Sequence, residues 1–278
     1  MNNTNNTTFA LILTVENKKS INNINNNSLE ERDFEKESIR CIKNWRLNGG
    51  WLKNIPIYIH CPSFELSKET TQHYNDYNAV LLYNYIEDIY KYDYGFINVH
   101  YSGKYFSSIL KEDILIHIDL DMELLRPLSV DFFDPILKNN FEVMIGGYSN
   151  NDYKNQRKPL FGKVLLNTDI IISKNIFSNT LYNTIINCCD FINNNQDILK
   201  LNNLFRIYDI EEYGADLAYT LLRDNIFILH DYEQGEGYYD NNLKNIPYFW
   251  HEHITTKLNT ELFLQKRKIL SYINSNNI

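Results

Sequence analysis

The stretch that most constrains the fold is the run ILIHIDLDMELLRPL from Ile114 to Leu128, in which a short apolar segment leads into two aspartates. Its first five residues are mostly β-forming and apolar, which is typical of a central parallel strand covered on both faces. Asp119 follows at the carboxyl end of that strand. In open α/β sheets this is the edge where ligands bind. The stretch therefore predicts a buried strand that carries acid to the ligand-binding edge of a sheet.

The two aspartates, Asp119 and Asp121, are spaced to share a ligand. Side chains two residues apart on an extended segment point to one side, so both carboxylates can reach one hard cation such as Mn²⁺ or Mg²⁺. Such a cation can in turn hold a diphosphate. Because Asp-x-Asp also occurs often by chance, it is the apolar strand before the pair that favours a metal site.

Apolar runs of strand length alternate with helical patterns along the rest of the chain. Strands are predicted at 9–15, 55–60, 79–83, 141–145, 164–172, 226–229 and 247–253, and helices at 29–44, 68–77, 105–110, 130–137, 176–192, from 213, and at 258–273. This alternation favours an α/β fold with a mostly parallel central sheet flanked by helices. The length of 278 residues suits one such domain, which we expect over 9–278 after a disordered Asn- and Thr-rich tail over 1–8.

Composition excludes several classes of protein. The formal net charge of -8 disfavours a nucleic-acid-binding surface, which needs clustered Lys and Arg. Four cysteines without a C-x-x-C pair indicate neither a zinc knuckle nor a disulfide framework, and they fit a reducing, cytoplasmic compartment. With no long apolar run and no basic leader, we expect a soluble protein without a signal peptide or membrane span.

The apolar strand, the Asp-x-Asp pair and the later Arg126-Pro127-Leu128 together resemble the metal-binding stretch of nucleotide-sugar glycosyltransferases with the GT-A fold. The likeness is closest to glycogenin-like and bacterial lipopolysaccharide galactosyltransferase families, and it extends from Phe9 to about His253. It implies a single GT-A, Rossmann-like domain with a Mn²⁺ or Mg²⁺ cofactor. It also implies transfer of a sugar, with retention, from a UDP-sugar donor to a hydroxyl of a glycan or protein acceptor.

The same resemblance assigns residues to the donor. It puts the nucleotide base beside Thr14 and Val15, at the end of the first strand. It places Lys104 near the start of the short helix before the Asp pair, where the ammonium group would meet the donor phosphates. A solvated surface lysine is an equally good interpretation of Lys104.

Two further residues match positions that contact the sugar or the reacting centre in these families. Asn167 matches a sugar-contacting Asn, although Asp169 replaces the Gly that usually follows two residues later. Asp216 matches the second acid of an Asp-Gln-Asp motif at the start of an apolar helix. The alternatives are an Asn in a tight connection and an Asp that caps the helix.

The families complete the metal shell with a histidine on a late strand. Chain order makes His251 the best match, with His253 and His230 as alternatives. Neither candidate strand keeps the Lys-Pro-Trp step that accompanies this histidine in the families, so all three remain open.

Two other functions remain alternatives. Phosphohydrolases of the haloacid dehalogenase type also end a strand in Asp-x-Asp, but on their first strand, whereas three predicted strands precede Asp119 here. A nucleotide-sugar binding protein without turnover would carry the same site residues as the enzyme.

Overall fold

A seven-stranded sheet in the order β3-β2-β1-β4-β7-β6-β8 forms the centre of the computed structural model. Its strands are β1 (Phe9–Thr14), β2 (Ile57–His60), β3 (Ala79–Leu82), β4 (Ile114–Ile118), β6 (Val143–Ser149), β7 (Val164–Lys174) and β8 (Ile226–Leu229). Neighbouring strands are parallel except where β7 is one of the pair. The structure describes residues 7–16, 33–62, 64–83, 97–149, 164–195, 197, 209–230, 233–235, 248–251, 266–271 and 275.

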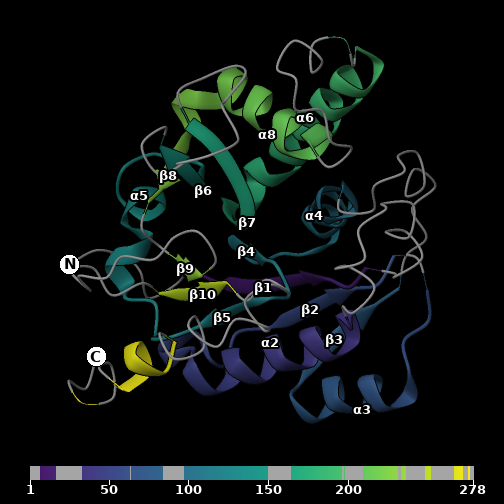
Figure 1. Ribbon diagram of the computed structural model, residues 1–278, viewed down its shortest axis with the longest axis vertical. Coiled ribbons are helices and arrows are strands. Elements are labelled where there is room, and N and C mark those ends of the chain that lie inside the picture. Colours follow the sequence, from purple (N-terminus) through teal and green to yellow (C-terminus); the bar gives the residue numbers. More distant parts are fainter. Residues whose placement is uncertain are drawn as a thin grey trace.

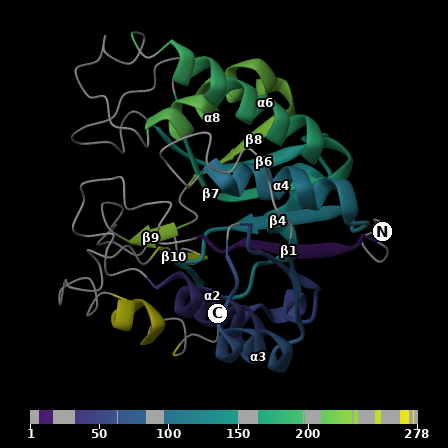
Figure 2. The ribbon, with the colours of Figure 1, turned by 90° about the vertical axis from the view of Figure 1, so that its right-hand side faces the viewer.

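Helices cover both faces of this sheet (Figures 1 and 2). On one face lie α2 (Phe34–Asn48) and α3 (Lys68–Asp76), and on the other α4 (Asn98–Ile109), α6 (Asn175–Asn194) and α8 (Asp209–Leu222). Along β1, Leu11 and Leu13 belong to the core on the α2 side, whereas Ile12 packs with Phe106 of α4. Because both faces are buried, the strands need apolar side chains at nearly every position. The predicted α/β fold with a mostly parallel sheet is confirmed.

The strand before the Asp pair, β4, is central and buried at all five positions. Its one polar residue, His117, contacts Thr14 Oγ1 through Nε2 at 3.2 Å and Tyr182 Oη through Nδ1 at 3.0 Å. Burial, and then the neighbouring His100 and His60, lower the pKa of His117 to about 3, so this imidazole is neutral. The prediction of a buried central strand is confirmed, but β4 is parallel only to β1 and is antiparallel to β7.

A second sheet of three strands lies beside the carboxyl end of β4. It has the order β5-β10-β9, with β5 (Met122–Leu124), β9 (Glu233–Gly235) and β10 (Phe249–His251). β9 lies between the predicted strands at 226–229 and 247–253, where we predicted no strand, and it is parallel to β10. On β5, Glu123 pairs with Arg40 of α2 at 3.0 Å and with Lys266 of the C-terminal helical segment at 2.8 Å. These ion pairs connect the end of the chain to the small sheet.

Two helix starts were predicted too late. α4 begins at Asn98 instead of about residue 105, and α8 begins at Asp209 instead of Tyr213. Each helix contains a glycine, which in the sequence alone indicates a helix boundary. A Cβ at Gly103 would overlap the ring of Tyr182, and one at Gly214 would overlap the thiol of Cys189. These glycines let α4 and α8 approach α6 closely, so they do not end a helix.

Other boundaries also differ from the expectations. β6 continues past Ile145 through both of the following glycines, with a register shift between Ile145 and Gly146. β7 is one continuous antiparallel strand. The polar residues 167–169 therefore lie within a strand and not in a tight connection. Near the amino terminus, Thr8, which we expected in the disordered tail, donates two hydrogen bonds of 2.8 Å to Asp113 and is therefore part of the fold.

The remaining short elements are 3-10 turns and one short helix: η2 (Gly50–Leu52), η5 (Val130–Phe133), α5 (Asp134–Leu137) and η6 (Arg223–Asn225). All four cysteines are buried and none forms a disulfide. Among the described residues, no helix is both long enough and apolar enough to cross a membrane.

Candidate functional site

Polar residues from several elements meet at the carboxyl ends of the central strands. Because β1, β2 and β4 are parallel neighbours, their carboxyl ends lie at one edge of the sheet. α4 and α8 each lead into the amino end of a parallel strand, so their first turns lie near the same edge. The fold therefore brings the acid pair and the first turns of two helices to one place.

The Asp119–Asp121 segment is a turn and not the extended segment that was predicted. The amide of Met122 donates to the carbonyl of Asp119 at 3.2 Å, which is the hydrogen bond of a β-turn. The amide of Asp119 donates to the carbonyl of Asp169 on β7 at 2.9 Å. This turn connects β4 of the central sheet to β5 of the small one. The relative position of the two carboxylates is thus set by the turn and not by strand parity.

Both acids lie on the α2 side of this edge. Burial raises the pKa of the Cys41 thiol on α2, and the charges of Glu123, Asp121 and Asp119 raise it further. The charges of both aspartates therefore act on the same side chain of α2, that of Cys41. Asp121 is 2% exposed, so its carboxylate is largely withdrawn from water.

The small sheet brings His251 next to the acid pair. In the antiparallel pairing of β10 with β5, His251 is opposite Met122, the residue that follows Asp121. The side chain of His251 and the whole of His253 lie outside the described residues. His230 is exposed at the end of β8, and β8 is three strands from β4, roughly 14 Å away at the usual strand spacing. Of His230 and His251, the two candidate histidines whose backbone is described, His251 thus has the position that fits the predicted ligand.

The donor set fits a hard cation only in part. The carboxylates of Asp119 and Asp121 are oxygen ligands of the kind that Mn²⁺ and Mg²⁺ prefer. Among the described residues, no group of three or more His, Cys, Asp or Glu is arranged to hold a metal. A cation at this turn would therefore take its remaining ligands from a bound diphosphate or from a side chain such as that of His251.

The end of β1 presents a different side chain from those predicted. Thr14 and Val15 are buried, and the Thr14 hydroxyl contacts His117 inside the fold. The next residue, Glu16, accepts a hydrogen bond of 3.1 Å from the Asn98 amide nitrogen. Burial raises the pKa of Glu16 to about 8, so this carboxyl is protonated at neutral pH. A base at this edge would meet the Glu16–Asn98 pair as well as the backbone of Val15.

Lys104 lies in the middle of α4, because the helix begins at Asn98. Six residues of helix correspond to about 9 Å, and α4 runs away from the carboxyl edge. The placement of Lys104 near a helix start is therefore wrong, and its contact with the donor phosphates stays a prediction.

Glu211, in the first turn of α8, is the acid that sequence analysis missed. Its Oε1 accepts hydrogen bonds from Thr168 Oγ1 at 2.7 Å and from His100 Nε2 at 2.6 Å. Thr168 immediately precedes Asp169, whose carbonyl holds the amide of Asp119. The Glu211 carboxylate is thus connected to the Asp-x-Asp turn through two adjacent residues of β7. Glu211 could have been recognised as an acid three residues before Gly214. It was missed because the helix was predicted to start at Tyr213, which put Glu211 outside it.

The structural positions of Asp216 and Asn167 differ from those predicted from the sequence. Asp216 is fully buried inside α8, five residues or about 7.5 Å along the helix from Glu211, so it cannot cap the helix. Asn167 pairs with Gly146 across β6 and β7, and its side chain lies outside the described residues. The catalytic roles of both residues stay predictions.

Neither family models nor curated proteins match this chain. A fold of this class hosts many activities, so only the residues of the site can indicate what the protein does.

Proposed function

We propose that this protein is a metal-dependent glycosyltransferase that moves a sugar from a UDP-sugar to an acceptor hydroxyl. The observation that carries the proposal is the acid turn at Asp119 and Asp121. It follows a buried central strand at the ligand-binding edge, and the β10–β5 register brings His251 beside it. The resemblance of the same stretch to glycosyltransferases supplies the substrate class.

Within this proposal, Asp119 and Asp121 would hold Mn²⁺ or Mg²⁺, with His251 as the third protein ligand. The cation would stabilise, as a Lewis acid, the negative charge that develops on the departing diphosphate. Asp121 is 2% exposed, so a cation bound to its carboxylate would be largely shielded from water.

Glu211 is the residue that we assign to the sugar or the acceptor. Thr168 and His100 both donate to its Oε1, which fixes the orientation of the carboxylate at the edge of the site. An oriented carboxylate can accept the acceptor's proton in an inverting transfer, or stabilise a positively charged sugar in a retaining one. Retention is expected from the family resemblance alone. Asp216 lies deeper along the same helix, so Glu211 is the better candidate for this role.

The phosphohydrolase alternative is less well supported. In haloacid dehalogenases the Asp-x-Asp pair follows the first strand, whereas here it follows β4, the fourth strand in the chain. A binding protein without turnover would share the whole site, and only an assay of turnover separates it from the enzyme.

The test is a titration of UDP, by calorimetry, in the presence of Mn²⁺ or of EDTA, followed by measurement of UDP release from UDP-sugars. We expect UDP binding that EDTA abolishes, and slow UDP release with at least one UDP-sugar. The Asp119→Asn, Asp121→Asn double variant should bind UDP equally weakly in both conditions. Equal UDP affinity with Mn²⁺ and with EDTA in the unaltered protein would refute the metal-dependent site.

A further inference from the structure

A pocket of about 350 Å³ is lined by residues of β8, η5 and α5, together with His230 after β8 and Tyr248 before β10. Its volume is in the range of small-molecule sites. Its wall combines three aromatic rings with aliphatic and polar side chains: Phe132, Phe227, Tyr248, Pro135, Ile228, Leu229, Asp131 and His230.

The aromatic part of the wall is held by neighbouring side chains. The rings of Phe132 and Tyr248 are 4.9 Å apart and inclined at 66°. The Arg126 guanidinium lies 3.8 Å from the centre of the Tyr248 ring, and the Tyr248 and Ser129 hydroxyls are 3.2 Å apart. Rings fixed in this way form an apolar surface that need not be ordered when a ligand binds.

The polar part of the wall is at the rim. Asp131 has an 86% exposed side chain, and His230 is also exposed. A carboxylate accepts hydrogen bonds, and an imidazole can both donate and accept them, so the two together suit hydroxyl groups. A ligand with apolar C–H faces and a ring of hydroxyls would match both the wall and the rim. This is the chemistry of a sugar.

The pocket also lies at a suitable distance from the acid turn. The amide of Leu125 on the β5 side donates to the carbonyl of Tyr248 at 2.8 Å. Tyr248 precedes His251 by three residues of extended chain, which corresponds to roughly 10 Å. One or two sugar rings span such a distance.

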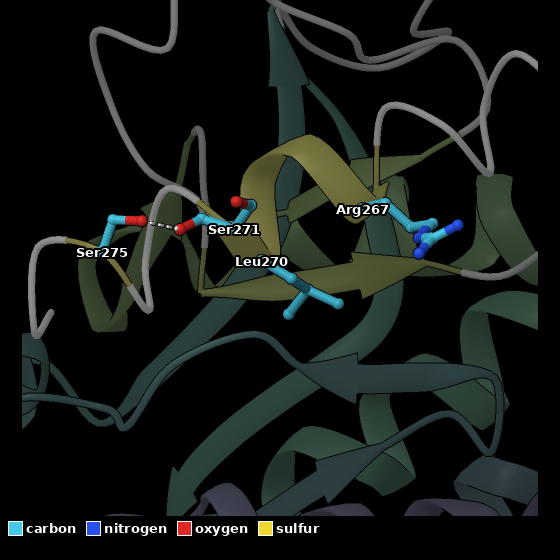
Figure 3. Close-up of a pocket in the computed structure, with 4 residues that line it drawn as sticks. All are labelled: Arg267, Leu270, Ser271 and Ser275. Atoms are coloured by element: carbon cyan, nitrogen blue, oxygen red, sulfur yellow. Dashed lines mark hydrogen bonds between the residues drawn. The ribbon is translucent and has the colours of Figure 1, made fainter.

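We propose that this pocket binds the sugar acceptor, as a glycan whose ring packs on Phe132 and Tyr248 while its hydroxyls contact Asp131 and His230. The assignment rests on the proposed function. A second hollow, of about 450 Å³, lies along the C-terminal helical segment and is lined by Arg267, Leu270, Ser271 and Ser275 (Figure 3). Its described lining comes from one stretch of chain and contains no aromatic ring, so it does not offer the same chemistry.

The test uses saturation-transfer NMR on the full-length protein with maltose, lactose and cellobiose as probes and glycerol as a small polyol control. We expect at least one disaccharide, but not glycerol, to receive saturation. The Asp131→Ala, His230→Ala double variant should bind that disaccharide about tenfold more weakly or worse, since each lost hydrogen bond costs about 1 kcal/mol.

The matched control is Asp224→Ala, which removes a 94% exposed acid at the opposite end of β8 and should leave sugar binding unchanged. The proposal is overturned if no disaccharide binds, or if the double variant binds as tightly as the unaltered protein. UDP titration of the same samples reports on the proposed function separately. Sugar binding without UDP binding would keep the pocket and reject the glycosyltransferase.

Discussion

The protonated state of Glu16 at the end of β1 leads to a prediction about how stability depends on pH. Its pKa is raised by burial from 4.5 to about 8, against the opposing effect of the hydrogen bond from Asn98. Between these two pH values the folded chain keeps a proton that the unfolded chain releases. The free energy of unfolding must therefore fall as pH rises from 4.5 to 8. The difference of about 3.5 pH units corresponds to about 5 kcal/mol at 1.36 kcal/mol per unit.

The perturbation is Glu16→Gln, which keeps the size of the side chain and an oxygen that can accept from Asn98, but cannot ionise. We expect the variant and the unaltered protein to be equally stable near pH 4.5. The variant should become more stable, relative to the unaltered protein, by up to about 5 kcal/mol near pH 8. The assay is urea unfolding followed by fluorescence at several pH values and constant ionic strength.

The matched control is Glu35→Gln on α2. Burial raises the pKa of Glu35, but hydrogen bonds from Thr70 and Ser67 outweigh it and hold the pKa below its usual value. This carboxylate stabilises the fold above its unfolded pKa and loses that contribution as pH falls, so its replacement should cost stability at neutral pH and not in acid. If the stability difference between Glu16→Gln and the unaltered protein is the same at pH 4.5 and pH 8, the assignment of a neutral Glu16 is wrong.

Three further predictions concern the site and its support. Glu211→Gln should reduce sugar transfer at least about 100-fold, the usual scale for a catalytic acid or base, with little change in UDP affinity; a parallel loss of UDP affinity would assign Glu211 to donor binding instead. His251→Ala should weaken Mn²⁺ binding in the presence of UDP and His230→Ala should not, as measured by Mn²⁺ titration; the reverse result would show that the late strand was assigned wrongly. Gly103→Ala should lower the free energy of unfolding by about 1–3 kcal/mol, because the added methyl group overlaps Tyr182, and a variant as stable as the unaltered protein in urea would contradict the close approach of α4 and α6.

The sequence did not distinguish glycines that end a helix from glycines that allow two helices to pack closely. Gly49 and Gly50 follow the end of α2, and Gly50 has a φ of 58°, which favours glycine. Gly103 and Gly214 instead lie inside α4 and α8. What separates the two cases is a side chain on α6, and no local pattern contains that information.

The polar contacts of the candidate site could not be predicted from the sequence either. Glu16 and Asn98 are 82 residues apart, and Glu211 is 111 residues from His100. Each pair forms only because the strand order brings the first turns of α4 and α8 to the end of the central strands. Burial then changes the chemistry, as for the Glu16 carboxyl, whose pKa of about 8 could not be inferred from its neighbours in the chain.

The sequence is sufficient to predict the α/β fold, the buried strand β4 and the acids at its end. A strand covered on both faces is apolar at nearly every position, and in β4 only His117 interrupts the run, so the strand end is visible as the first acid, Asp119. The sequence does not show that the acid pair forms a turn, that the backbone of His251 lies beside it, or that Glu211 is connected to it through Thr168 and Asp169. These features depend on strand order and on pairing between distant segments, which hydrophobic periodicity does not encode.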